Sequence, residues 1–350
     1  MASEVRVNSI TNRSGLGTAT FNNDGSITFA GNLNLNSVTT TARNAGVSTA
    51  TGAVIFNSTD AEVQAWDGSK WTTLSNAITF EATGGTLDST SRSGWNIHTF
   101  TSPGTFSVTG LASPSDTEYL VVAGGGGGGG APAWVGGGGG AGGHRSGTLQ
   151  FAVGSYPVTV GGGGNGGSNA DGTAGTNSSV STITSQGGGF GSAPGNDAGP
   201  GGSGGGSGSD SAGVKGTGNR ETGTTTPAPS QGNPGGTGDK VPGTGPNGPW
   251  GAGGGGGAGA AALDAPSTAA SAGGNGTPNS ITGTSVTRAG GGGGGHYPSG
   301  GEPGGTGGGG DGDQSSAGSG TANTGGGGGG GGSNGGSGGS GIVIIAYPTS

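Results

Sequence analysis

The sequence predicts an all-β protein with a large glycine-rich insertion, and three observations lead to this fold class. Residues 124–341 contain 88 glycines in 218 positions, whereas the 123 residues before them contain 12. This glycine-rich segment begins directly after the apolar run 119–123 and ends directly before the apolar run 342–347. Short apolar runs bounded by turn-forming residues are typical of buried strands. We therefore interpret the segment as an excursion between two strands that depend on each other.

Composition excludes several classes of function. Only 26% of the 350 residues are apolar and 5% aromatic, too few for a conventional core along the whole chain. The net charge is −8 and Lys and Arg form no cluster, so we expect no nucleic-acid partner. The absence of cysteine excludes disulfides and thiolate metal sites. Residues 1–6 lack the apolar stretch of a signal peptide, and no apolar run approaches the roughly 20 residues of a membrane span. We expect synthesis in the cytoplasm.

Two β regions are predicted before the glycine-rich part. In residues 1–45, short segments of β-favouring residues are broken by Gly and Asn, and none is long enough to be stable alone. We therefore expect other chains to complete the core of this region. Residues 46–76 are predicted to form a small β-hairpin module, with Asp67-Gly68 as the tight turn between two Trp-bearing strands. The candidates for its apolar cluster are Val63, Ala65 and Trp71.

Residues 77–350 are predicted to form a third domain. A β scaffold at 95–184 and 341–348 carries the glycine-rich insertion 124–341, and several of its segments alternate apolar and polar residues as half-buried strands do. The expected strands are 95–101, 105–109, 119–123, 149–153, 156–160, 180–184 and the closing run 342–347. These strands predict a small antiparallel sheet or sandwich.

The glycine runs themselves predict a bundle of polyglycine II helices. This left-handed helix has three residues per turn, rises about 3.1 Å per residue and makes no internal hydrogen bonds, so its amides can bond sideways. Because glycine has no Cβ, such helices can approach closely, and each N–H can reach the C=O of a neighbour. The runs 124–130 and 325–332 contain only glycine. We expect these two runs to be the central helices of the bundle.

Two other structures are possible for a glycine-rich segment. Collagen requires glycine at every third position, and residues 224–230 and 296–298 break any such frame. A flexible glycine/serine linker remains the alternative from composition alone. It is less favoured because a linker rarely starts and ends at two buried strands.

Several segments resemble proteins of bacteriophage tails. Residues 3–12 (SEVRVNSITN) resemble the start of virion proteins of cyanobacterial phages, and residues 52–74 resemble a short β module of tail fibres. Residues 95–348 resemble the glycine-rich domain common in phage tail fibres. That resemblance depends on the segments IHTFTSPGTF (97–106), LVVAGGG (120–126), GGAGG (139–143), YPVTVG (156–161) and GIVIIAYP (341–348). The domain is also similar to tip adhesins of T-even-like phages, in which polyglycine II helices present receptor-binding loops.

The sequence contains no catalytic or metal-binding constellation, so we expect no enzyme activity, no cofactor and no metal. Residues 201–205 match Gly-x-Ser-x-Gly but lack the strand and helix of a nucleophile elbow. Asp311-Gly312-Asp313 departs from the calcium-binding nonapeptide, and we expect a solvated acidic turn. The scattered histidines include His98, which alternates with apolar neighbours and is expected to be structural.

The candidate binding residues are the few large side chains that interrupt the glycine runs, namely Trp134, Phe190, Trp250, His296 and Tyr297. If the runs are helices, these interruptions are connecting loops, and loops on a scaffold carry recognition. Aromatic side chains bury large areas with few rotatable bonds. Alternatively, Trp134 and Phe190 fill the small β core. We expect Trp250 and Tyr297 to be exposed, and the glycine-poor segments 275–287 and 221–231 to be loops at the tip.

The resemblance implies a virion tail-fibre subunit that binds a host-cell surface receptor, either a polysaccharide or an outer-membrane protein. Its N-terminal region would attach to other tail proteins and form a homotrimer. One alternative is a purely structural fibre of the neck, head or baseplate. Another is an ice-binding protein, which would carry regularly spaced Thr or Ala on one face; the sequence lacks that regularity.

Overall fold

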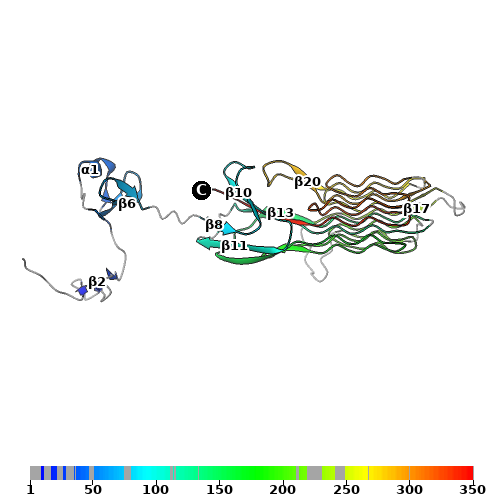
Figure 1. Ribbon diagram of the computed structural model, residues 1–350, viewed down its shortest axis with the longest axis horizontal. Helices are drawn as coiled ribbons and strands as arrows, with labels where there is room; N and C mark the ends of the chain where they lie inside the picture. The colour runs from blue at the N-terminus through cyan, green and yellow to red at the C-terminus, as the bar shows by residue number, and fades with distance from the viewer. Residues whose placement is uncertain are drawn as a thin grey trace, which may run out of the picture. The chain divides into compact units, whose positions relative to one another are not determined.

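The structure is a computed structural model (Figure 1), and its chain divides into two compact units, Met1–Ile78 and Thr79–Ser350. The residues described are 9–11, 17–21, 27–28, 35, 37–46, 51–74, 80–110, 113, 116–132, 134–209, 213–218, 231–240, 249–266, 268–298 and 300–349. Among these residues almost all regular structure is strand, which confirms the all-β fold class. The described part contains no helix long and apolar enough to cross a membrane.

The described residues of the first unit form two small sheets. One is antiparallel and consists of β1 (Ser9–Thr11), β2 (Gly17–Phe21) and β3 (Ile27–Thr28). The other has the order β4-β5-β6-β7, formed by β4 (Ser37–Val38), β5 (Val54–Asn57), β6 (Glu62–Trp66) and β7 (Trp71–Thr73). A short helix, α1 (Thr40–Asn44), follows β4.

The predicted hairpin turn is confirmed between β6 and β7. Gly68 has φ +101°, and the Asp67 carboxylate accepts hydrogen bonds from the backbone N–H groups of Ser69 and Lys70, both at 2.8 Å. The predicted apolar cluster is only partly correct. Trp71 pairs with Trp66, whereas the register places Val63 and Ala65 on the opposite face of the sheet, because successive strand residues alternate in direction.

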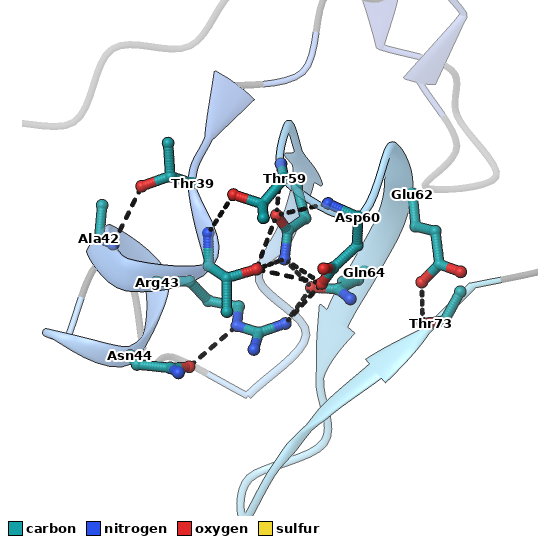
Figure 2. Close-up of polar contacts among 11 residues, drawn as sticks. Thr39, Ala42, Arg43, Asn44, Thr59, Asp60, Glu62, Gln64 and Thr73 are labelled. Carbon is teal, nitrogen blue, oxygen red and sulfur yellow. Dashed lines mark hydrogen bonds and ion pairs between the residues drawn. The ribbon is translucent and has the colours of Figure 1, made fainter.

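A polar network joins α1 to β5 and β6 (Figure 2). The Asn57 side chain is fully buried, and its amide donates to Thr40 Oγ1 at 3.0 Å, Asp60 Oδ2 at 2.7 Å and Gln64 Oε1 at 3.0 Å. Arg43 of α1 donates to the same Gln64 oxygen at 2.6 Å. Buried polar groups are tolerated when they are hydrogen-bonded, so this network positions the helix on the sheet.

The second unit begins with a sandwich of two five-stranded sheets. The first has the order β13-β12-β22-β10-β9, with β9 (Thr86–Asp88), β10 (Trp95–Phe100), β12 (Glu118–Val122), β13 (His144–Thr148) and β22 (Ile342–Pro348). The second has the order β16-β15-β14-β11-β8, with β8 (Phe80–Thr83), β11 (Gly104–Gly110), β14 (Gly154–Thr159), β15 (Ser178–Val180) and β16 (Ile183–Ser185). Phe100, Phe106 and Phe151 are among the buried residues between the sheets.

The two strands that flank the glycine-rich segment are direct neighbours. β22 pairs antiparallel with both β12 and β10, and Val122 lies opposite Ile342. Six of its seven residues are buried, as its nearly continuous apolar sequence requires, because the first sheet is covered on both faces. The predicted excursion between two interdependent strands is therefore confirmed.

Two strand predictions need correction. Residues 149–153 form no strand. Instead, Phe151 and Ser113 are joined by two hydrogen bonds: Ser113 N–H donates to Phe151 O, and Phe151 N–H donates to Ser113 Oγ. The Phe151 side chain still enters the core, with 1% of its surface exposed. Residues 180–184 belong to two strands, β15 and β16, because Ser181 has φ +52° and the chain reverses there.

The outer face of the first sheet carries a hairpin, β19 (Thr277–Asn279) and β20 (Val286–Arg288). Ile281 from its turn packs in the apolar cluster of that face. Arg92 binds the Glu118 carboxylate through two nitrogens, at 2.7 and 3.0 Å, lies 3.5 Å from the ring centre of Trp95 and donates to Ile281 O. The prediction that 275–287 is a tip loop is therefore wrong. Residues 221–230 lie outside the described residues, and Gln231 is buried.

The glycine runs form an ordered bundle with the predicted three-residue period. In run 124–130, N–H groups at every third position donate to the same neighbouring run. Three neighbouring runs accept these bonds, namely 170–176, 336–339 and 137–140. Three others donate to the carbonyls of run 124–130, namely 188–191, 164–167 and 328–331. The N···O distances of all these bonds are 2.8 to 3.1 Å. A run with six bonded neighbours is the expected arrangement for polyglycine II helices, whose amides all point sideways.

The same pattern surrounds run 325–332, so both predicted central helices are confirmed. The spacing leaves no room for side chains, because a Cβ on Gly128 would lie 2.0 Å from the carbonyl oxygen of Gly329. In the described residues, the glycine-rich segment is thus a close-packed bundle and not a flexible linker.

The runs alternate in direction between the sandwich and a distal end. Run 124–130 leaves β12 and run 136–143 returns into β13, so the turn 131–135 lies away from the sandwich. Figure 1 shows the runs extending from the sandwich to the end marked by β17 (Asp239–Lys240). The hydrogen-bond register places further turns at this distal end, namely 168–169, 193–198, 296–298, 314–316 and 333–334.

Candidate functional site

Three of the five candidate residues form one aromatic stack at the distal end. Trp250 and Tyr297 are cross-strand partners, because β18 (Trp250–Gly251) pairs with β21 (His296–Tyr297) and with β17. The ring centres of Trp250 and Tyr297 are 5.7 Å apart with 29° between the ring planes. Trp134, from the turn 131–135, stacks on Trp250 at 4.3 Å and 13°. The sequence named these residues without indicating that they would meet.

Trp250 is buried, which corrects the prediction that it is exposed. Only 1% of its surface is accessible, whereas Trp134 and Tyr297 are half-buried. Its central position explains the difference, because β18 is the middle strand of the sheet β17-β18-β21 and the Trp250 ring stacks with both Trp134 and Tyr297. Trp250 therefore supports the distal end, and Trp134 and Tyr297 are the aromatic residues of the stack that reach its surface.

His296 and Phe190 occupy different positions. His296 is half-buried on β21 and lies opposite Gly251. Phe190 lies along run 186–192, and its ring faces Gly199, where an added Cβ would be 2.4 Å from it. Among the described residues, neither Trp134 nor Phe190 belongs to the apolar clusters of the sandwich, so the alternative that they fill the β core is wrong.

A pocket of about 630 Å³ opens at the distal end beside Trp134. Three separate turns build it, and its lining residues are Ala131, Pro132, Trp134, Asn169, Ala170, Asp171, Ala193, Pro194 and Asn196. We call this cavity the distal pocket. Its size lies within the range of about 300 to 1,000 Å³ that is typical of small-molecule sites.

Asp171 is the polar centre of the distal pocket. Its Oδ1 accepts the backbone N–H of Ala193 at 2.7 Å, and the Asn196 amide donates to Oδ1 at 3.1 Å and to Oδ2 at 3.2 Å. These bonds tie the turn at 169–171 to the turn at 193–196. The sequence features that predicted binding residues were large side chains and long glycine-poor segments, and neither includes Asp171 or Asn196. Short polar interruptions such as Asn169-Ala170-Asp171 were the available signal.

Ser203 and His98 are both buried and packed within the fold. Ser203, the centre of the Gly-x-Ser-x-Gly match, is completely buried inside the bundle. His98 is held by Gly84 O at 2.7 Å from Nδ1 and by the Tyr347 hydroxyl at 3.0 Å from Nε2, and burial lowers its pKa. This confirms the structural role predicted for that histidine. His98, His144 and His296 lie on three different strands.

The acidic residues of segment 311–313 bond to the backbone, and this segment is the end of a run that leads into the turn 314–316. The Asp311 carboxylate accepts the N–H of Gly304 at 2.8 Å, and that of Asp313 accepts the N–H groups of Ser315 and Ser316 at 2.7 and 3.1 Å. The Asp313 carboxylate thus caps the turn 314–316, whereas Asp311 joins two neighbouring runs, so the predicted acidic turn is only partly correct. In the part of the chain that the structure describes, no group of three or more His, Cys, Asp or Glu residues is placed to hold a metal ion.

Comparison with known protein families gives one match. A family described as a glycine-rich domain matches residues 101–348, from the turn after β10 to the last residue of β22. The match thus covers most of the sandwich and the whole glycine bundle. A comparison with curated proteins gives no match. Because the family covers well over half of the sequence, the chain belongs to the glycine-rich domain family.

Proposed function

We propose that the protein is a subunit of a phage tail fibre and that the distal end of its glycine bundle binds a host-cell surface receptor. The observation that carries this proposal is the position of the distal pocket and of Trp134. Both lie at the end of a bundle held by backbone hydrogen bonds between its runs, opposite the sandwich in which that bundle is anchored. Loops held on a rigid scaffold are common recognition surfaces. The resemblance of residues 3–12, 52–74 and 95–348 to phage proteins supports the virion assignment.

The proposed binding is reversible and non-covalent, with a polysaccharide or an outer-membrane protein as the receptor. No enzyme activity is part of the proposal. The regions 1–45 and 46–76 attach the subunit to other tail proteins and form a homotrimer, and residues 77–350 bind the receptor. Several copies on one virion strengthen attachment, because linked weak sites act at a high effective concentration.

One observation favours a second candidate function, a purely structural virion fibre. Trp250, the most buried aromatic residue of the distal end, is covered by its own neighbours and is not presented to a partner. In this case the aromatic stack only closes the end of the bundle. The bundle would then serve as a spacer without a receptor.

Adsorption competition separates the two functions. The purified full chain is added to cells of the phage's host before infection, and free phage is counted over time. An adhesin binds the cells and slows adsorption in proportion to its concentration. A folded chain that neither binds host cells nor slows adsorption contradicts the receptor-binding proposal and leaves the structural fibre.

A further inference from the structure

We propose that the distal pocket is a glycan subsite that takes an uncharged pyranose ring, an inference that deepens the proposed function and names the receptor chemistry. The pocket combines two kinds of wall. One is apolar and consists of Trp134, Pro132 and Pro194; the other is polar and contains Asp171 and Asn196. A pyranose has the matching division, because its C–H groups form an apolar face and its hydroxyls project from the rim.

The apolar wall is suited to a sugar face. Trp134 is half-buried, lines the pocket and is fixed by its stacking on Trp250, so its ring is already oriented before a ligand arrives. An aromatic ring offers a large contact area with few rotatable bonds. A group that is ordered in the free protein loses little conformational entropy on binding, which favours affinity.

The polar wall is suited to hydroxyl donors. Asp171 Oδ1 accepts two hydrogen bonds, from Ala193 N–H and the Asn196 amide, whereas Oδ2 accepts one among the described residues, from that same amide. A carboxylate has about four lone-pair positions, so Asp171 retains acceptor capacity toward the pocket. A charged acceptor makes stronger hydrogen bonds than a neutral one, and two neighbouring sugar hydroxyls can donate to it.

Charge excludes acidic sugars. Among the described residues that line the pocket, Asp171 alone is charged, and none is Lys or Arg. A uronic acid, a sialic acid or a phosphorylated sugar would bring a second anion beside this carboxylate without a compensating cation. Such like-charge juxtaposition disfavours the wrong partner, so the pocket selects neutral hexoses and N-acetylhexosamines.

Titration of the purified full chain tests the proposal. The ligands are a panel of methyl glycosides of neutral hexoses and N-acetylhexosamines, with methyl glucuronide matched to methyl glucoside because their ring hydroxyls have the same configuration. Saturation-transfer NMR and calorimetry report binding. We expect at least one neutral glycoside to bind, and the uncharged glucoside to bind at least tenfold more tightly than the glucuronide. Failure of the whole neutral panel to bind, or equal binding of the matched pair, overturns the proposal.

Variants locate the binding to the pocket. Asp171→Asn keeps the side-chain shape and is expected to weaken binding of the neutral ligand at least tenfold. Asp311→Asn is the matched control, because the Asp311 carboxylate, like that of Asp171, accepts a backbone N–H from another segment of the bundle and does not line the pocket. If Asp171→Asn melts earlier than Asp311→Asn, Trp134→Phe replaces it as the test and is expected to weaken binding several-fold. Unchanged affinity in the folded pocket variant overturns the assignment.

Binding to host cells, measured in parallel, separates this inference from the proposed function. If the chain binds neutral glycosides through Asp171 but does not bind cells, the glycan subsite is supported and the receptor-binding function is contradicted. If the chain binds cells equally with and without the Asp171→Asn change, the receptor-binding function is supported and the glycan subsite is contradicted.

Discussion

The indole rings of Trp134 and Trp250 stack with 4.3 Å between their centres and 13° between their planes. The two residues are 116 positions apart in the sequence, and each occupies a break between glycine runs. Their contact joins the turn 131–135 to β18, and Tyr297 extends the stack on β21. Because the rest of the bundle has almost no large side chains, this stack is its main apolar cluster at the distal end.

Removal of the central ring should destabilise this end. We expect Trp250→Ala to lower the free energy of unfolding of the second unit by about 3–5 kcal/mol, the usual cost of a buried aromatic truncation. Calorimetry and the exciton-coupled Trp band in circular dichroism measure the effect. Leu263→Ala is the control, because Leu263 is 79% exposed and its truncation should cost no more than about 0.5 kcal/mol. Equal stability of the two variants would contradict a structural role for the stack.

Glycine at the bundle centre should be irreplaceable. A Cβ at Gly128 would lie 2.0 Å from the carbonyl oxygen of Gly329, and backbone cannot move aside as a side chain can. We expect Gly128→Ala to cost more than the roughly 1–3 kcal/mol of ordinary overpacking.

The matched control for Gly128 is Gly162→Ala. At Gly162 an added Cβ meets only Thr176 Oγ1, at an ordinary 3.9 Å. This substitution should be neutral or stabilising by about 0.4–1 kcal/mol, because it restricts the unfolded chain. Thermal melting compares the two variants, and similar melting temperatures would argue against close packing of the central run.

Arg92 should hold the β19–β20 hairpin on the sandwich. It joins Glu118, Trp95 and Ile281, and its side chain is 23% exposed. We expect Arg92→Ala to cost about 1.5–3 kcal/mol, the range for hydrogen bonds to charged groups. Hydrogen exchange of the hairpin amides should accelerate.

Lys215→Ala is the control for Arg92. Its ion pair with Asp264 is exposed on both sides, at 37% and 57%, and such pairs contribute about 0–1 kcal/mol. If the hydrogen-exchange rates of the hairpin amides stay at the wild-type value in Arg92→Ala, the packing of Ile281 and the pairing of β19 with β20 are enough to hold the hairpin in place without Arg92.

Stability should fall between neutral and mildly acidic pH. Burial, with a smaller contribution from the nearby Arg288 charge, lowers the pKa of His144 to about 4, whereas an unfolded histidine titrates near about 6.5. Above pH 6.5 this histidine is neutral in both states. As the pH falls toward 4, only the unfolded chain takes up the proton, so about 3 kcal/mol of stability is lost.

Denaturant unfolding at several pH values from 7 to 4 measures this loss, and His144→Gln should reduce the slope. His98 remains in that variant and adds a dependence of the same sign, because burial lowers its pKa as well. The lowered pKa of Asp264, about 2, affects stability only below about pH 4, outside this window. An unchanged slope in His144→Gln would exclude His144 as the source.

Local sequence features predicted much of the fold. The apolar runs beside Val122 and Ile342 indicated two strands that depend on each other, because each run would expose a large apolar surface to water if it were not packed against the other. Asp67-Gly68 indicated a turn through its own backbone preferences. The uninterrupted runs 124–130 and 325–332 indicated the bundle centre, because only glycine can pack where a Cβ would meet a neighbour's carbonyl.

The candidate site could be predicted only in part. The sequence determined which residues interrupt the glycine runs, and with them the few side chains available for recognition. Which interruptions meet depends on the direction and register of the runs. Backbone hydrogen bonds between glycines fix both, and because these bonds involve no side chains, the sequence does not reveal them. Tertiary structure alone therefore decided that Trp250 is buried between Trp134 and Tyr297, that the 275–287 segment lies on the sandwich, and that Asp171 and Asn196 share a pocket with Trp134.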